Sequence, residues 1–144
     1  MTAPLAFGAD IPFVHHLGFA LHVFDGGRSE IRYAPRPEHL NSFQVTHGGA
    51  CMTLLDVTMA VAARSVAQDM GVVTIEMKTS FMKPARGPLV GRGQLLHRTR
   101  STAFVEARIF DAEGTLCAHS TGTFRYVPRA PGHDASASGR IATD

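Results

Sequence analysis

Hydrophobic residues run almost without interruption from Gly48 to about Gln68, and they do not alternate with polar ones. The segment is rich in alanine, leucine and methionine, a composition that at this length favours a helix over a strand. A helix without a clear polar face has to be covered on most of its sides. The pattern therefore predicts one long, central and buried helix.

On both sides of this segment the pattern changes to the alternation of hydrophobic and polar residues that is typical of β-strands. Before the helix it predicts a strand from Leu17 to Val23 and a second from Ser29 to Tyr33, joined by a turn at Asp25-Gly26-Gly27. After the helix it predicts four more strands, at about 73–81, 89–99, 102–110 and 116–126.

The strand at 73–81 is predicted to have two different faces. Its odd-numbered residues, including Ile75 and Phe81, form the more apolar face, whereas Thr74 lies on the polar face with the other even-numbered residues. In the next strand, Gly91 and Gly93 indicate a bulge or a close approach of the backbone. A phosphate-binding loop is not expected there, because no helix follows the two glycines.

The order of two strands, one helix and four strands predicts an α+β fold, and residues 1–127 are expected to form a single domain. A helix that is apolar on nearly every side needs more cover than a flat sheet provides. An antiparallel sheet therefore has to curl around it, or a second subunit has to help. Residues 128–144 are polar and rich in proline, glycine and serine, and they are expected to form a disordered tail.

Composition and charge exclude several classes of function. The formal net charge is only +2 and the 14 lysine and arginine residues are scattered, so a nucleic acid is not an expected partner. The sequence shows neither an uncharged run of about 18 apolar residues nor a secretory signal, which predicts a cytoplasmic protein without a membrane partner. Cys51 and Cys117 have neither metal-ligand nor redox spacing, and no metal or other cofactor is expected.

The start of the predicted helix combines residues that can carry chemistry. His47, Gly48 and Gly49 precede the apolar run, Asn41 lies six residues before His47, and Asp56 lies nine residues after it. A glycine pair at a helix start exposes unpaired backbone N–H groups, and the helix dipole favours negative charge there. Gly48 is therefore a candidate donor to an oxyanion. Asp56, if ionised inside an apolar helix, requires a protein partner or a wet cleft.

The stretch Asn41-Ser42-Phe43-Gln44-Val45-Thr46-His47-Gly48-Gly49, followed by Leu55-Asp56, resembles the HGG-x6-D signature of the phenylacetate-pathway (PaaI-like) acyl-CoA thioesterases. The similarity extends over about residues 15–127, and it includes the strand up to Ala85 and the turn at 111–114. The resemblance implies the hotdog fold, in which a curved antiparallel sheet wraps one central helix and pairs edge to edge with a second copy. It also implies a homodimer that assembles to a homotetramer.

The resemblance further implies a hydrolase that converts an acyl-CoA to a free acid and coenzyme A. Asp56 would act as general base or as a nucleophile that forms an anhydride, and the Gly48 N–H would polarise the carbonyl. Asn41 would hold the carbonyl or the water, or it only caps a turn. His47 would bond near the thioester sulfur, or it only braces the loop. Thr74 would orient the water, or it is only a β-branched strand residue.

Coenzyme A carries phosphates, which makes cations at strand ends candidate ligands for it. The candidates for substrate binding are Gly49, Lys83, Arg86, Arg98, Arg100 and Phe81. Further apolar residues are candidates for an acyl pocket as well as ordinary core residues, namely Phe43, Met52, Met59 and Met82. An aryl or medium-chain acyl group is expected. Two other functions stay open, a (de)hydratase of the same fold and a non-enzymatic acyl-CoA sensor.

Overall fold

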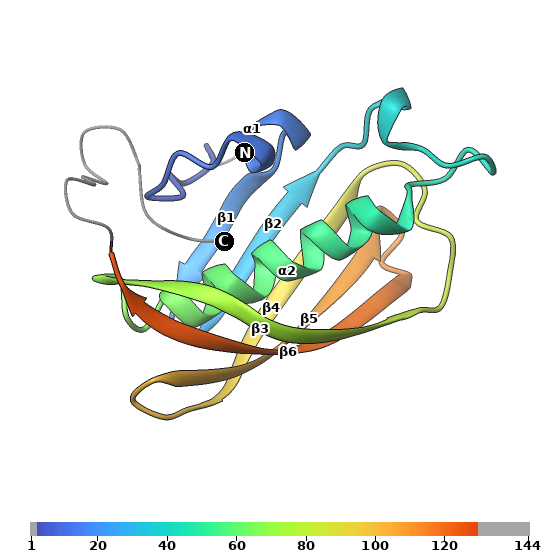
Figure 1. The fold of residues 1–144 in the computed structure, drawn as a ribbon. Helices are drawn as coiled ribbons and strands as arrows, with labels where there is room; N and C mark the ends of the chain where they lie inside the picture. The colour runs from blue at the N-terminus through green and yellow to red at the C-terminus, as the bar shows by residue number, and fades with distance from the viewer. Residues whose placement is uncertain (1–2, 130–144) are drawn as a thin grey trace.

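The computed structural model of the protein describes residues 3–129. Its elements are, in chain order, α1 (Pro12–Leu17), β1 (Ala20–Asp25), β2 (Arg28–Tyr33), the 3-10 turn η1 (Pro37–His39), α2 (Gly48–Arg64), β3 (Met70–Phe81), β4 (Leu89–Arg98), β5 (Thr102–Asp111) and β6 (Leu116–Pro128). The strands form one six-stranded antiparallel sheet with the order β1-β2-β4-β5-β6-β3. The sheet curves around α2, which lies across one of its faces (Figure 1). The predicted α+β architecture is confirmed.

Helix α2 is buried against the sheet through the apolar residues that predicted it. Leu54, Leu55 and Met59 have no exposed surface. The helix ends at Arg64, before the expected Gln68, because the chain turns back there and the Arg64 guanidinium binds the turn. It donates to the carbonyl of Gln68 at 3.4 Å and, through Nε, to the carbonyl of Met70 at 3.2 Å.

The glycines of β4 allow α2 to lie close to the sheet. A Cβ on Gly93 would lie 2.5 Å from the Ser29 Oγ and 2.7 Å from the Thr58 carbonyl oxygen, and a Cβ on Gly91 would lie 2.6 Å from the Thr58 Oγ1. The Ser29 hydroxyl uses this close approach to donate to the Thr58 carbonyl at 2.6 Å. Of the two interpretations of these glycines, the structure supports the close approach.

The first predicted strand is wrong at its start, because Leu17 is the last residue of α1 and β1 begins at Ala20. Helix signals outweigh the alternation of hydrophobic residues at this place. Pro12 occupies the first turn of α1, and Gly18 follows the last turn in the left-handed conformation, with φ 76°. The other five predicted strands agree with the structure to within about three residues.

Strand β3 does not keep the alternation that the sequence predicts. Its pairing with β6 shifts between Thr74 and Glu76, so that Ile75 is an extra residue in a β-bulge. Because of this extra residue, even-numbered side chains such as Val72 face α2 before the bulge, and odd-numbered ones such as Met77 face it after the bulge. Thr74 therefore points towards α2, where it contacts Asp56, and Met77 packs against the core. The predicted position of Thr74 on the polar face is wrong.

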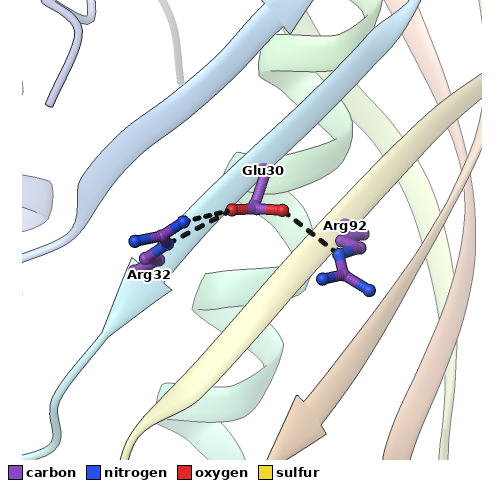
Figure 2. Close-up of polar contacts among 3 residues, drawn as sticks. All are labelled: Glu30, Arg32 and Arg92. Atoms are coloured by element: carbon purple, nitrogen blue, oxygen red, sulfur yellow. Dashed lines mark hydrogen bonds and ion pairs between the residues drawn. The ribbon is translucent and has the colours of Figure 1, made fainter. Parts of the chain in front are cut away.

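The face of the sheet away from α2 carries cross-strand charge pairs. The Glu30 carboxylate accepts hydrogen bonds from Arg32 on the same strand and from Arg92 on β4, both at 3.2 Å (Figure 2). Glu106 on β5 pairs in a similar way with Arg108 and with His119 on β6. This polar outer face is typical of an antiparallel sheet whose other face covers the core.

Strand β3 is a long edge of the sheet. It has 12 residues, and within the described chain only β6 pairs with it. Two of its apolar side chains are more than half exposed, Ile75 at 58% and Phe81 at 54%. An edge of this length, with apolar side chains, is suited to pairing with another chain.

None of the helices between residues 3 and 129 is long and apolar enough to span a membrane. Strand β6 runs through Pro128, and residues 130–144 of the predicted tail lie outside the described residues.

Candidate active site

The loop between residues 39 and 47 closes on itself and leads the chain to the start of α2. The His47 N–H donates to the His39 carbonyl at 2.8 Å, and Leu40 pairs with Thr46 in an isolated bridge. The Thr46 N–H donates to the Ala85 carbonyl at 2.9 Å, which ties the loop to the segment that follows β3. The start of the helix is thus held from two sides.

His47 is the N-cap of α2. Its Nδ1 accepts a hydrogen bond from the Gly49 N–H at 2.8 Å, and its carbonyl accepts from the Ala50 N–H at 2.9 Å. The ring therefore braces the helix start, which is the simpler of the two roles considered for it. The Gly49 N–H is used in the same cap and is not available to a substrate.

Gly48 is the first residue of α2, and no residue in the described part of the chain accepts a hydrogen bond from its N–H. This N–H lies at the positive end of the helix dipole. The Phe81 ring lies 3.6 Å from the point that a Cβ of residue 48 would occupy. The free donor therefore lies beside an apolar surface, where a hydrogen bond to an oxyanion is stronger than in water.

A cavity of about 540 Å³ opens beside Gly48. Its wall comes from the loop before α2, the first turn of α2, the end of β3 and the start of β6, and its polar residues include Asn41, Lys83 and Arg86. The wall is mostly apolar and includes Phe43, Cys51, Phe81, Met82, Cys117 and Ala118. A cavity of this size with an apolar wall and a few polar groups is typical of a small-molecule site.

Several residues of this wall were not among the sequence-based candidates, and Cys51, Cys117 and Ala118 are three of them. Cys51 lies three residues after Gly48, so helical spacing alone would have placed it on the same side of α2. Cys117 and Ala118 have no such signal, because only the pairing of β6 with β3 brings them there, with Ala118 opposite Phe81. Met59, a sequence-based candidate for the pocket, lies in the core instead, and Met52 lies outside the wall.

Cys51 is a wall residue and not a nucleophile. Burial, together with the neighbouring Cys117, raises the pKa of its thiol to about 11. The thiol is therefore neutral at pH 7, when only a thiolate would attack a thioester.

Asn41 lines the cavity, but the oxygen of its side-chain amide holds the loop. Its Oδ1 accepts from the Phe43 N–H at 2.8 Å and from the Val45 N–H at 3.3 Å, which is the turn-capping role considered for it. The amide Nδ2 makes no hydrogen bond with residues 3–129. Nδ2 is the group of Asn41 that can donate to a ligand.

Asp56 and Thr74 contact each other where α2 packs against β3. The Thr74 Oγ1 donates to the Asp56 Oδ1 at 2.6 Å, although 18 residues separate them in the chain. Neither residue lines the cavity beside Gly48. Asp56 lies eight residues after Gly48 on the same helix, which corresponds to about 12 Å along the axis. One chain therefore does not bring the carboxylate to the Gly48 N–H.

The four candidate cations fall into two groups. Lys83 and Arg86 lie at the cavity. Arg98 stacks over the Tyr126 ring at 4.3 Å, and Arg100 lies in the hairpin between β4 and β5. The Tyr126 hydroxyl donates to the Ala63 carbonyl near the last turn of α2, so Arg98 is at the end of the helix opposite to Gly48.

The fold and the geometry of this site define a hotdog-fold hydrolase in which a helix start opens on an apolar cavity. Residues 43–118, which are just over half of the chain, match the Thioesterase superfamily, and the chain belongs to this superfamily of thioester hydrolases. The resemblance to the PaaI-like hotdog thioesterases is confirmed.

Known proteins support this family. A protein of Saccharolobus solfataricus, described as a candidate esterase, is 33% identical over 104 residues, which are 72% of this chain and 74% of that protein. A conserved protein of Pseudomonas aeruginosa has a similar structure, with a TM-score of 0.79 and 28% identity over 83% of this chain and 97% of the other. A candidate thioesterase of Ralstonia eutropha JMP134, described as related to phenylacetic acid degradation, has a TM-score of 0.75 and 28% identity over 81% and 92% of the two chains.

Proposed function

We propose that the protein hydrolyses the thioester of an aryl or medium-chain acyl-CoA to the free acid and coenzyme A. The observation that carries the proposal is the Gly48 N–H, which has no acceptor within residues 3–129 and lies beside an apolar cavity. Thioester hydrolysis needs a donor at the place where the carbonyl oxygen gains negative charge. The apolar wall suits the acyl group, and Lys83 and Arg86 suit the phosphates of coenzyme A.

In the proposed reaction the thioester oxygen accepts a hydrogen bond from the Gly48 N–H, and the Asn41 amide donates to the same oxygen or to the water. Asp56 either takes a proton from the attacking water or attacks the carbonyl carbon and forms an anhydride that water then opens. In both routes the C–S bond breaks and coenzyme A leaves as a thiol after gaining a proton. The Thr74 hydroxyl donates to the Asp56 Oδ1 and orients the carboxylate for either route.

The proposed site is shared between two chains. Asp56 is about 12 Å along the helix axis from Gly48 and does not line the cavity, so we propose that the carboxylate at each Gly48 comes from the Asp56 of a second chain. In the proposed dimer, β3 pairs antiparallel with the β3 of a second copy at this edge of the sheet, and the two helices would then lie side by side in opposite directions. Asp56 of one chain then approaches the helix start of the other. Two such dimers would form the homotetramer that the resemblance implies.

We also propose that the protein is cytoplasmic. Cys51 and Cys117 are free thiols, which suits the reducing cytoplasm in which we place the protein.

The first test is a thiol-release assay on purified protein with benzoyl-, phenylacetyl-, hexanoyl- and octanoyl-CoA. Asp56→Asn should lower turnover about a hundredfold or more, because it removes the base or nucleophile. Full activity in this variant would discard the mechanism. Tight binding of the thioesters without any hydrolysis by the wild type would favour an acyl-CoA sensor instead, and hydration of an unsaturated acyl-CoA would favour a (de)hydratase.

A pair of variants at one position tests the oxyanion donor. Gly48→Pro removes the N–H, and proline is tolerated as the first residue of a helix. His47 already has ψ 138°, the conformation that a residue before proline prefers. Turnover should fall about a hundredfold or more. Gly48→Ala keeps the N–H, its Cβ makes only ordinary contact with Phe81, and it should retain most of the activity. Equal activity of the two variants would remove Gly48 from the mechanism.

A further inference from the structure

A buried histidine lies next to the candidate site and takes no part in the proposed reaction. His39 ends the turn η1 and is only 7% exposed. Its Nδ1 lies 2.8 Å from the Tyr33 hydroxyl and 3.2 Å from the Arg36 backbone nitrogen. Its Nε2 is buried and has no hydrogen-bond partner in the described part of the chain. A histidine in this position was not among the candidates from the sequence.

These contacts assign the protonation state of the ring. A backbone N–H can only donate, so the Arg36 N–H requires a lone pair on the His39 Nδ1. The Tyr33 hydroxyl then also donates to Nδ1, and the proton of the imidazole resides on Nε2. A second proton on Nδ1 would face the Arg36 N–H directly. The loop is therefore built around a neutral imidazole.

The ring connects the core of the sheet to the start of α2. Tyr33 on β2 is 2% exposed and packs edge to face against the Phe19 ring at 4.9 Å, so its hydroxyl is firmly placed. The His39 carbonyl accepts the His47 N–H at 2.8 Å, and His47 is the N-cap that precedes Gly48. A movement of His39 is thus passed to the residue whose N–H meets the substrate.

We infer that His39 is a positioning residue, which as a neutral imidazole fixes the loop from which Gly48 presents its N–H. The inference rests on the proposed function, because it concerns the placement of the proposed oxyanion donor. It names a residue outside the proposed catalytic set, and it predicts a dependence on pH that Asp56 alone does not give.

The charged and titratable groups around the ring support a neutral His39 at pH 7. They are Tyr33 on β2, Arg36 and Glu38 at η1, His16 on α1, whose ring centroid is 6.1 Å away, and Cys51 on α2, which lies near Tyr33. Burial and then the Arg36 charge hold the pKa of His39 below its ordinary value, with His16 acting in the same direction and Glu38 opposing them. Burial raises the pKa of Tyr33 to about 12, so this phenol stays a donor.

The sign of the pH effect follows from the lowered pKa. The folded chain binds this proton less readily than the unfolded chain, so the loop is intact at neutral pH and loses stability as the pH falls through the lowered pKa of His39. Turnover should therefore fall at acid pH. Part of this fall in the pH–rate profile should come from protonation of His39, and it should be the same for every thioester substrate.

Two substitutions separate position from charge. His39→Asn places Oδ1 near the position of Nδ1, so it keeps an acceptor for Tyr33 and Arg36 but cannot take up a proton. It should keep kcat at pH 7 close to that of the wild type and lose the part of the acid limb that belongs to His39, while the part that belongs to the Asp56 carboxyl remains. His39→Leu removes the acceptor and should lower kcat about tenfold or more with little change in KM, because the donor is displaced. His97→Asn, an exposed histidine on β4, is the matched control and should change neither.

An NMR measurement keeps this test separate from the test of the proposed function. In protein with ¹⁵N-labelled histidine, the His39 Nδ1 should be unprotonated and Nε2 protonated at pH 7, and the His47 amide should shift in His39→Leu whatever the enzyme hydrolyses. If the wild type hydrolyses none of the thioesters, the proposed function fails. The NMR signals still test whether His39 is neutral and whether it holds the helix start in place. A protonated Nδ1 at pH 7, an unchanged His47 amide, or a His39→Leu variant with wild-type kcat would overturn the inference. If His39→Leu does not fold, the acid limb of His39→Asn and the tautomer of the wild type decide it.

Discussion

A direct hydrogen bond from Thr74 on β3 orients the carboxylate of Asp56 on α2. Thr74→Val keeps the shape of the side chain and removes the hydroxyl that donates to Asp56 Oδ1 at 2.6 Å. We expect turnover to fall about tenfold or more, because the carboxylate loses its fixed orientation. Steady-state kinetics with the most active thioester would measure the change.

A matched control for this variant exists on the outer face of the sheet. The Thr123 hydroxyl donates to the Glu76 carboxylate at 2.9 Å, so Thr123→Val removes the same kind of bond away from the site. It should leave turnover unchanged. Equal losses in both variants would mean that a general loss of stability, and not the Thr74–Asp56 contact, lowers the rate.

A second residue-scale prediction concerns stability and pH. The hydrogen bond with His119, and then Arg108, hold the pKa of the Glu106 carboxyl below its ordinary value. A lowered pKa means that this carboxylate stabilises the fold above the ordinary glutamate pKa of about 4.3, and that the contribution is lost as the pH falls below it. Glu106→Gln should therefore reduce the free energy of unfolding at pH 7 by about 1 kcal/mol or less, and by less at pH 4, where part of the contribution is already lost.

Urea unfolding at pH 7 and at pH 4 would test this prediction. Glu113→Gln, in the exposed turn between β5 and β6, is the control and should have no effect at either pH. A difference for Glu106→Gln that is larger at pH 4 than at pH 7 would have the wrong sign.

At the same scale, the unbonded N–H at the helix start could be predicted from the sequence better than the contacts of individual side chains. The free Gly48 N–H follows from a glycine at the first helical position, which is a local property. The use of the Asn41 Oδ1 by the Phe43 and Val45 N–H groups depends on the fold of one loop. The contact of Ala118 with the cavity depends on which strands are neighbours, and no local pattern contains that information.

At the scale of elements, the glycines of β4 determine how closely α2 approaches the sheet. Gly93→Ala would place a methyl group 2.5 Å from the Ser29 Oγ and 2.7 Å from the Thr58 carbonyl oxygen, so the helix would have to move outward. We expect a loss of about 1–3 kcal/mol in the free energy of unfolding, which is the usual cost of overpacking. Chemical denaturation of the wild type and the variant measures it.

A double variant identifies the cause. Ser29→Ala in the Gly93→Ala background removes the hydroxyl but leaves the Thr58 backbone in place, so it should recover only part of the loss. A single Gly93→Ala variant that is as stable as the wild type would mean that the helix does not depend on this contact.

The number and order of the six strands and the long helix could be predicted from the sequence, whereas the helix α1 at Leu17 and the phase of β3 could not. Alternation fixes which residues share a face only while the strand stays regular, and one extra residue reverses the faces beyond it. Ile75 is apolar and β-branched, so nothing in its own chemistry marks it as the bulged residue. Its effect is nevertheless what turns Thr74 towards Asp56.

At the scale of the whole molecule, the proposed dimer accounts for two separate features. The Gly48 N–H and the Asp56 carboxylate belong to the same helix but do not meet, and β3 leaves a 12-residue edge that only β6 pairs with among the described residues. A partner chain at this edge would supply the carboxylate and cover the exposed Ile75 at the same time. Assembly and catalysis are then coupled by the geometry of the fold.

This coupling makes a quantitative prediction for mixed dimers. Asp56→Asn and Gly48→Pro are each expected to be nearly inactive, but a dimer with one chain of each kind would contain one site with an intact Gly48 from one chain and an intact Asp56 from the other. Random association at equal amounts gives such dimers in half of the population, with one good site of two, so activity should recover to about one quarter of the wild type. The two variants should be co-expressed in equal amounts, and the activity per chain of the mixture should be compared with that of the wild type and of each variant alone. A mixed dimer that stays as inactive as either parent would mean that both groups act within one chain, and the free edge of β3 would then have no part in the reaction.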